Sequence, residues 1–119
     1  MTLEQIKAMT DDELRIKVAE LMGWVSVPHR TRPLTGKEFS VDTQGTAWTE
    51  LPYEMPNWPG DLNACAEMED TLDDSQKDSF EYLLGIVIGP GRERWRWHLL
   101  HATARQRCEA FIATKEREV

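Results

Sequence analysis

Apolar side chains recur every three or four residues along much of this chain, which is the pattern of helices with one buried face. The clearest repeat begins after Thr10, a good N-cap that has capping-box spacing with Glu13. Gly23 ends the repeat at a position that favours a left-handed backbone. The apolar residues between them follow at i, i+4, i+7 and i+8 and are Leu14, Val18, Leu21 and Met22. We therefore predict a helix over Asp11–Met22.

Four further helices are predicted from caps and apolar stripes of the same kind. Their start signals are the capping-box pairs Thr2–Gln5 and Thr103–Gln106, the single cap Asp61, and either Asp73 or Asp74. The matching stripes, in chain order, are Leu3, Ile6 and Met9; Leu62, Cys65, Ala66 and Leu72; Phe80, Leu83, Leu84 and Val87; and Ala104, Cys108, Phe111 and Ile112. The third helix is expected to end near Thr71. The β-branched stretch Ile86–Ile88 could instead form a strand.

Strand signals are fewer. The residues of Arg94–Leu99 alternate, with Trp95, Trp97 and Leu99 on one side and Arg94, Arg96 and His98 on the other. This strand is expected to run directly into the last helix. Trp24–Val27 is a short strand candidate that stops at Pro28. Lys37–Val41 and Thr46–Leu51 could form a hairpin around Asp42–Gly45.

The middle of the chain, His29–Gly60, is broken by prolines and glycines. A disordered linker is one interpretation. Three aromatic side chains, Trp48, Tyr53 and Trp58, are costly to leave in water, so we expect the segment to pack on the rest. The expected architecture is a single α+β domain over residues 1–119, with a small sheet packed between helices in an α/β/α sandwich-like arrangement.

Composition is ordinary for a globular chain of 119 residues, with 40% hydrophobic and 29% charged residues. No apolar run approaches the roughly 20 residues that span a bilayer, and the N-terminus lacks the pattern of a signal peptide. A cytosolic location and no membrane partner are therefore expected. Cys65 and Cys108 are expected to be small core residues, because a disulfide needs close approach and is disfavoured in the cytosol.

The net charge of −7 is unevenly distributed. The segment from Glu38 to Glu81 contains twelve acidic residues and one basic residue, Lys77. From Tyr82 onward, seven basic residues outnumber four acidic ones. The acidic middle argues against binding duplex DNA, where phosphate neutralisation dominates affinity. The basic last third could hold one small anion.

Three stretches, Leu14–Trp24, Asp61–Glu69 and His101–Phe111, carry a family resemblance in their residues, order and spacing. Together they resemble the phage ABA sandwich domain family, small proteins of tailed phages and prophages. The resemblance implies an α/β/α sandwich and supplies no catalytic motif. It also implies an accessory gene of a phage, with a role against host defence.

Catalytic and metal signals are weak. Gly89–Gly91 lacks the spacing of a nucleotide-binding loop. His98, His101 and Cys108 do not match zinc-ligand spacing, and an activated Cys108–His pair would need an exposed thiolate. The acidic pairs of the sequence fit helix ends better than a catalytic cleft. We therefore expect no catalytic residue, no metal and no cofactor.

The arginines give the most specific hypothesis. Arg94, Arg96 and His98 share one face of the expected strand, while Arg105 and Arg107 lie early in the following helix. If the strand end and the helix start converge, these groups could bind one phosphate, with Trp48 or Trp58 stacking on a base. The alternative is an exposed face whose arginines pair with the acidic middle segment.

Three functions follow in order of preference. The first is a phage-encoded, non-enzymatic accessory protein that binds a host factor or a phosphate-bearing, nucleotide-type signal molecule. The second is a protein-interaction or virion-associated module whose acidic surface meets a basic partner. The third is a small hydrolase. Tryptophan richness also suggests a homo-oligomeric surface.

Overall fold

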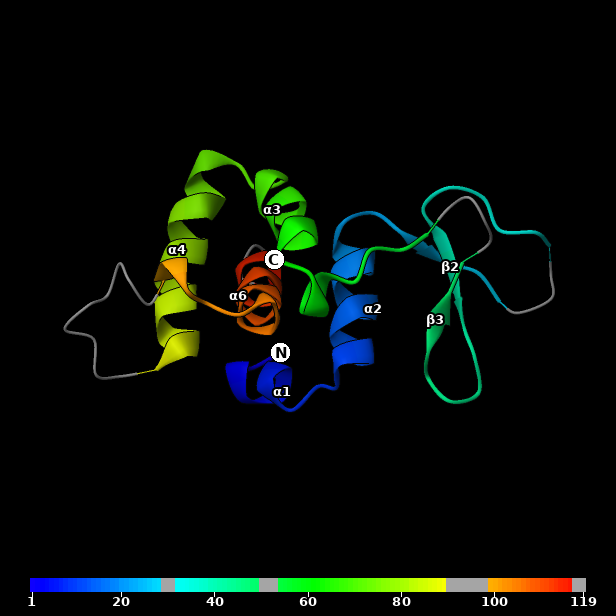
Figure 1. Ribbon diagram of the computed structural model, residues 1–119, viewed down its shortest axis with the longest axis horizontal. Helices are drawn as coiled ribbons and strands as arrows, with labels where there is room; N and C mark the ends of the chain where they lie inside the picture. The colour runs from blue at the N-terminus through cyan, green and yellow to red at the C-terminus, as the bar shows by residue number, and fades with distance from the viewer. Residues whose placement is uncertain (29–31, 50–53, 90–98, 117–119) are drawn as a thin grey trace.

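The computed structural model describes residues 1–28, 32–49, 54–89 and 99–116, and the fold is given for those residues. They form five α-helices, one 3₁₀ turn and a small sheet (Figure 1). The elements in chain order are α1 Leu3–Lys7, α2 Asp11–Leu21, β1 Val25–Ser26, β2 Glu38–Val41, β3 Ala47–Trp48, η1 Trp58–Gly60, α3 Leu62–Asp70, α4 Asp74–Ile88 and α6 Ala104–Glu116.

Every described helix begins where its cap predicts. Thr2, Thr10 and Asp73 each form a reciprocal capping box. Thr103 does the same, since its Oγ1 accepts from Gln106 N at 3.1 Å while its own N–H donates to Gln106 Oε1 at 2.9 Å. Asp61 accepts from Asn63 N at 2.9 Å. The helix predicted through Val87 is confirmed and the strand alternative for Ile86–Ile88 is wrong, because α4 continues to Ile88.

Helix α6 lies at the centre of the helical part of the molecule (Figure 1). It packs against α1, α2, α3, α4 and η1. All seven residues from Cys108 to Thr114 are buried, so enclosure extends around the helix and not only along the predicted stripe. The stripe itself is confirmed, because Cys108, Phe111 and Ile112 are fully buried. This helix is the common packing surface on which the others are arranged.

The sheet has the order β1-β2-β3. β1 pairs in parallel with β2 through Val25 and Glu38, and β2 pairs antiparallel with β3 through Ser40 and Trp48. The predicted hairpin is therefore present. Its turn is closed by the Asp42 carboxylate, which accepts from Gln44 N and Thr46 N at 2.9 Å, and by a glycine at position 45 with φ +85°.

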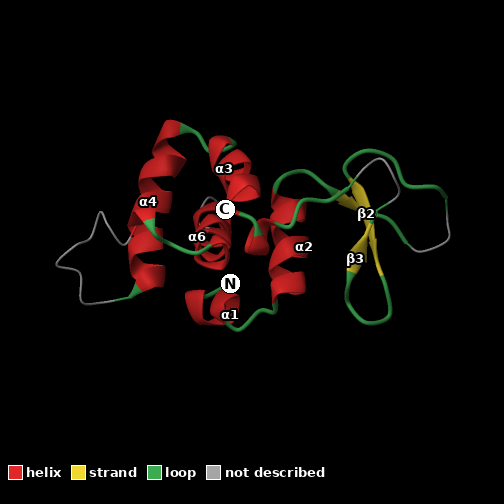
Figure 2. Cartoon of the chain, in the orientation of Figure 1, coloured by secondary structure: helices red, strands yellow, loops and turns green. Residues whose placement is uncertain are grey.

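The α+β class is confirmed, but the sheet is placed differently from the prediction. It lies at one end of the molecule beside α2, and the described helices do not cover it on both faces (Figures 1 and 2). Strands of two to four residues offer too little area to support two helical layers. Of the strand expected over Arg94–Leu99, residues 94–98 lie outside the described residues, and Leu99 is helical together with Leu100.

The buried face of α3 also differs from the prediction. Leu62 and Ala66 are exposed, whereas Ala64, Cys65 and Met68 are buried. The buried face of α3 is thus turned around the helix axis from the expected stripe, and Cys65 belongs to both. Burying Met68 in place of Ala66 removes more apolar area from water, which accounts for the rotation. It leaves Leu62 58% exposed on the outer surface of α3.

Candidate functional site

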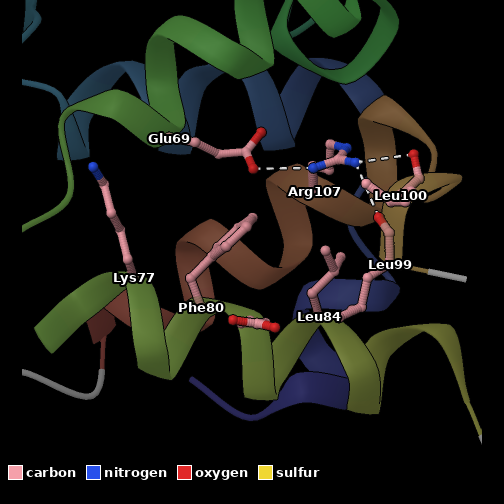
Figure 3. A pocket seen from close by; sticks show the side chains of 8 residues that line it. Glu69, Lys77, Phe80, Leu84, Leu99, Leu100 and Arg107 are labelled. Atoms are coloured by element: carbon pink, nitrogen blue, oxygen red, sulfur yellow. Dashed lines mark hydrogen bonds and ion pairs between the residues drawn. The ribbon is translucent and has the colours of Figure 1, made fainter. Parts of the chain in front are cut away.

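A hollow of about 460 Å³ opens between α3, α4 and the chain that enters α6 (Figure 3). This volume lies in the range of small-ligand sites. Most of its surface is apolar, with charged groups toward the rim. The lining residues are Glu69, Lys77, Phe80, Glu81, Leu84, Leu99, Leu100 and Arg107.

Helix α4 supplies one wall of the hollow. Lys77, Phe80, Glu81 and Leu84 follow at i, i+3, i+4 and i+7, so they share one helix face. Phe80 and Leu84 are also part of the core, where they are 7% and 3% exposed. Leu100 stands opposite and is 75% exposed. The hollow is therefore an opening of the core toward solvent, bounded by an exposed leucine.

An ion pair between Arg107 and Glu69 lines one side of the hollow (Figure 3). Arg107 Nη1 lies 3.0 Å from Glu69 Oε1, and Nη2 donates to the Leu99 carbonyl at 3.0 Å. Nη2 also approaches the Leu100 carbonyl and Nε the Ala102 carbonyl, both at 3.4 Å. Each guanidinium nitrogen therefore has a protein acceptor. Arg107 fastens residues 99–102 to α3 and α6.

The electrostatics of this ion pair oppose burial against attraction. Burial raises the pKa of Glu69, and the neighbouring Arg107 pulls it back down. The Arg107 guanidinium thus favours the ionised form of Glu69, which burial disfavours. Removing Arg107 would leave a half-buried carboxyl without its charge partner.

A second hollow of about 390 Å³ lies on the other side of the same ion pair. It is lined by Leu62, Ala66, Glu69, Asp70 and Arg107. Because Glu69 and Arg107 line both hollows, the ion pair forms a ridge between them. We call the two hollows together the double groove.

Charge around the double groove is mainly acidic. Asp70 lines one hollow and Glu81 the other. The exposed carboxylates Glu67, Asp74 and Asp78 lie on the same two helices. Lys77 is the exception, and its ammonium has no ion-pair partner within the part of the chain that the structure describes. This is the acidic middle of the sequence brought together on α3 and α4.

Arg105 and Arg107 do not converge. Arg105 forms an ion pair with Asp11, donates to the Lys7 carbonyl at 3.0 Å, and also contacts the Met9 carbonyl and Glu109. It therefore fastens α6 to the α1–α2 junction. Two residues apart on a helix means about 200° around its axis, so Arg105 and Arg107 point to different sides.

The remaining residues of the anion hypothesis, Arg94, Arg96 and His98, lie outside the described residues. The alternative interpretation is an exposed strand face whose arginines pair with the acidic middle segment. Within the described residues, Arg107 pairs with that segment through Glu69, whereas Arg105 pairs with Asp11 and Glu109, which lie outside it.

The two candidate stacking residues differ in exposure. Trp48 is half-buried on β3, beside a smaller hollow of about 280 Å³ that also includes Arg15 and Glu54. Trp58 is 1% exposed and packs edge-on against Trp24, with ring centroids 6.4 Å apart. The stacking role expected of Trp58 is therefore wrong, because the large indole is more stable in the core than on the surface.

Both cysteines are free and fully buried, as expected of core residues. A hydrogen bond with Cys65 and burial raise the pKa of Cys108, which keeps its thiol protonated. The same hydrogen bond lowers the pKa of Cys65, against the opposing effect of burial. Among residues 1–28, 32–49, 54–89 and 99–116, no cluster of three His, Cys, Asp or Glu side chains is placed to hold a metal ion.

Comparisons with protein-family models, curated proteins and solved structures found no match to this chain. No helix among the described residues is long and apolar enough to cross a membrane. The site must therefore be interpreted from its own chemistry. The sequence did contain one signal for it, the i, i+3, i+4, i+7 run from Lys77 to Leu84, in which the charged Lys77 and Glu81 alternate with the apolar Phe80 and Leu84.

Proposed function

We propose that this chain is a non-enzymatic binding protein that engages a host protein through the double groove. The observation that carries the proposal is the pair of hollows on either side of the Glu69–Arg107 ion pair. The resemblance to phage proteins adds the setting, an accessory protein in the host cytosol with a role against host defence.

The shape of the groove suits two apolar side chains of a partner. One would contact Phe80, Leu84 and Leu100, and the other Leu62 and Ala66. Buried apolar anchors in pockets supply most of the binding energy at protein interfaces. Leu100 and Leu62, at 75% and 58% exposed, would lose the most water-accessible surface on binding.

The charge of the groove indicates a basic partner. Asp70 lines one hollow and Glu81 the other, and Glu67, Asp74 and Asp78 are exposed on the same two helices. Lysine or arginine residues beside the apolar anchors would complement this surface. Rim charges of this kind accelerate association and select partners more than they add affinity.

The protein's own polar groups also favour binding over catalysis. Arg105 and Arg107 are committed to protein acceptors, and the Cys108 thiol is buried and protonated. The described groove thus provides shape and charge but no activated nucleophile.

The test is a panel of fluorescent amphipathic peptides, basic and acidic versions of the same apolar pattern, titrated against the purified protein. We expect a basic peptide to bind, and Leu100→Asp to weaken it by about tenfold or more because the apolar anchor loses its contact. Val25→Asp is the matched control, since Val25 is also an exposed apolar residue but lies on β1. Equal losses in the two variants, or preference for the acidic peptides, would contradict the proposal.

A phosphate-bearing small molecule is the second candidate, favoured by the position of Lys77. Its ammonium stands at the rim of an apolar hollow and could pair with a phosphate while a base lies on Phe80 and Leu84. Thermal-shift screening against nucleotides and cyclic oligonucleotides tests this. A shift abolished by Lys77→Gln but kept in the exposed control Lys37→Gln would favour the small ligand over the protein partner.

A further inference from the structure

The side chains of Cys65 and Cys108 lie in the same part of the core, where α3 packs against α6. Cys65 Sγ lies 3.0 Å from the Trp58 carbonyl and 3.5 Å from the Ala104 carbonyl. Ala104 is one turn before Cys108, and helical side chains lean toward the preceding turn. The Cys108 sulfur is therefore directed toward the carbonyl that the Cys65 sulfur contacts.

We propose that Cys65 and Cys108 form a dithiol site that a peroxide oxidises to an intramolecular disulfide joining α3 to α6. This inference is independent of the proposed binding function. It reverses the sequence-based argument in one respect, because the fold brings the Cys65 sulfur to within 3.5 Å of the backbone of α6 one turn before Cys108.

The reaction balances with a peroxide as the oxidant. One cysteine sulfur attacks a peroxide oxygen, the O–O bond breaks, and the sulfur becomes a sulfenic acid as the first water leaves. The second sulfur then attacks the first, the S–O bond breaks, and a second water leaves as the S–S bond forms. The two thiols lose two electrons and two protons in total, and hydrogen peroxide is reduced to water.

Burial determines which product forms. Both side chains are 0% exposed, and they are the two cysteines of the chain, so a sulfenic acid on one meets the other before any second molecule. Burial also makes the reaction slow, because peroxide must enter through local opening of the packing between α3 and α6. The expected product is a disulfide within one chain.

The position of the bond connects it to the double groove. Cys65 lies one turn before Glu69 on α3, and Cys108 directly follows Arg107 on α6. A disulfide would therefore fasten the two helices behind the ridge that separates the hollows. The Glu69–Arg107 distance would then be set by a covalent link as well as by the ion pair.

The experiment treats the folded, reduced 119-residue chain with hydrogen peroxide, then unfolds it and adds N-ethylmaleimide before mass analysis. We expect a monomer that has lost two hydrogens and takes up no maleimide, with a peptide linking Cys65 to Cys108 after proteolysis. The thermal midpoint should rise by roughly 5 to 15 °C, because the bond closes a long loop in the unfolded chain, and dithiothreitol should reverse the rise.

Two maleimide adducts after peroxide treatment, or disulfide-linked dimers, would overturn the proposal. Cys65→Ala and Cys108→Ala serve as controls, each checked for helix content, and neither should gain stability on oxidation. Because the main readout is the wild-type protein, the proposal stays testable even if one variant does not fold. Peptide binding to the double groove is measured separately in the reduced protein, so either idea can fail without the other.

Discussion

The helical cluster around α6 and the sheet beside α2 are stabilised in different ways. In the cluster, α6 is enclosed on nearly every side, and seven consecutive residues are buried. In the sheet, only the middle strand supplies fully buried side chains, Phe39 and Ser40. Val25 on β1 is 56% exposed, and Val41 at the end of β2 is 37% exposed. The cluster is held by apolar burial, and the sheet largely by local polar contacts.

Those polar contacts are specific. Glu38 forms a two-pronged ion pair with Arg32 and accepts from Thr35 N at 2.8 Å. These partners, Arg32 first, hold the pKa of Glu38 down to about 2. The Ser40 hydroxyl donates to the Val27 carbonyl. Exposed ion pairs and turns each contribute little to the free energy of unfolding. The stability of the sheet therefore depends on the helical cluster more than the stability of the cluster depends on the sheet.

The largest predicted effect is in the centre of the cluster. Phe111→Ala should destabilise the whole protein by about 3 to 5 kcal/mol, because it leaves a cavity in the most enclosed helix. Urea unfolding followed by far-UV circular dichroism measures the loss. Val41→Ala on the sheet is the control and should cost below about 0.5 kcal/mol. Similar losses for both variants would mean that the sheet is as strongly packed as the cluster.

A smaller effect separates local from global stability. Gly23 and Gly45 both have positive φ, +91° and +85°, and an added Cβ at either meets nothing within 4 Å. Alanine at either position should therefore cost about 1 kcal/mol through backbone strain alone. At Gly23, which follows α2, the cost should appear in global unfolding. At Gly45, it should appear as faster hydrogen exchange of the amides in β2 and β3, with the amides of α6 unaffected.

The smallest effect concerns pH and the buried Glu109. Burial raises its pKa, although the nearby Arg105 lowers it in part. Because the folded-state pKa exceeds the unfolded one, stability contributed by this group is present at low pH and is lost as pH rises through the folded value. The uncharged Glu109→Gln should therefore gain stability relative to wild type between pH 4 and pH 7, by roughly 1 kcal/mol or less.

Urea titrations at the two pH values test this last prediction. The exposed Glu67→Gln is the control for simple loss of one negative charge. A stability difference between wild type and Glu109→Gln that is constant across pH would show that the charge of Glu109 is fully compensated by Arg105. The sheet is not expected to take part, since Glu109 lies on α6.

Local signals allowed much of the fold to be predicted. Thr10, Asp73 and Thr103 marked helix starts correctly, because a cap acts within a few residues of sequence. The hairpin at Asp42–Gly45 could be predicted for the same reason. The buried side of α3 could not, because the choice between Ala66 and Met68 depends on where α6 and η1 lie.

The candidate site depended even more on tertiary structure. Arg107 was singled out from the sequence as a phosphate ligand, but its acceptors are Glu69, thirty-eight positions away, and carbonyls of the preceding turn. The role of Leu100 in lining the groove could not be predicted, because a single leucine has no periodic signal. The double groove exists only where α3, α4 and residues 99–100 meet. Composition did indicate its acidic character.

The central position of α6 has a consequence for synthesis on the ribosome. The other described helices are translated before α6, yet they share it as their packing partner. At 5 to 20 residues per second, roughly 5 to 20 s separate the synthesis of α1 from that of α6. During that interval the apolar faces that α1 to α4 pack against α6 have no partner. The nascent chain should therefore depend on chaperones, or on rapid closure once α6 emerges, more than a protein whose central element is made first.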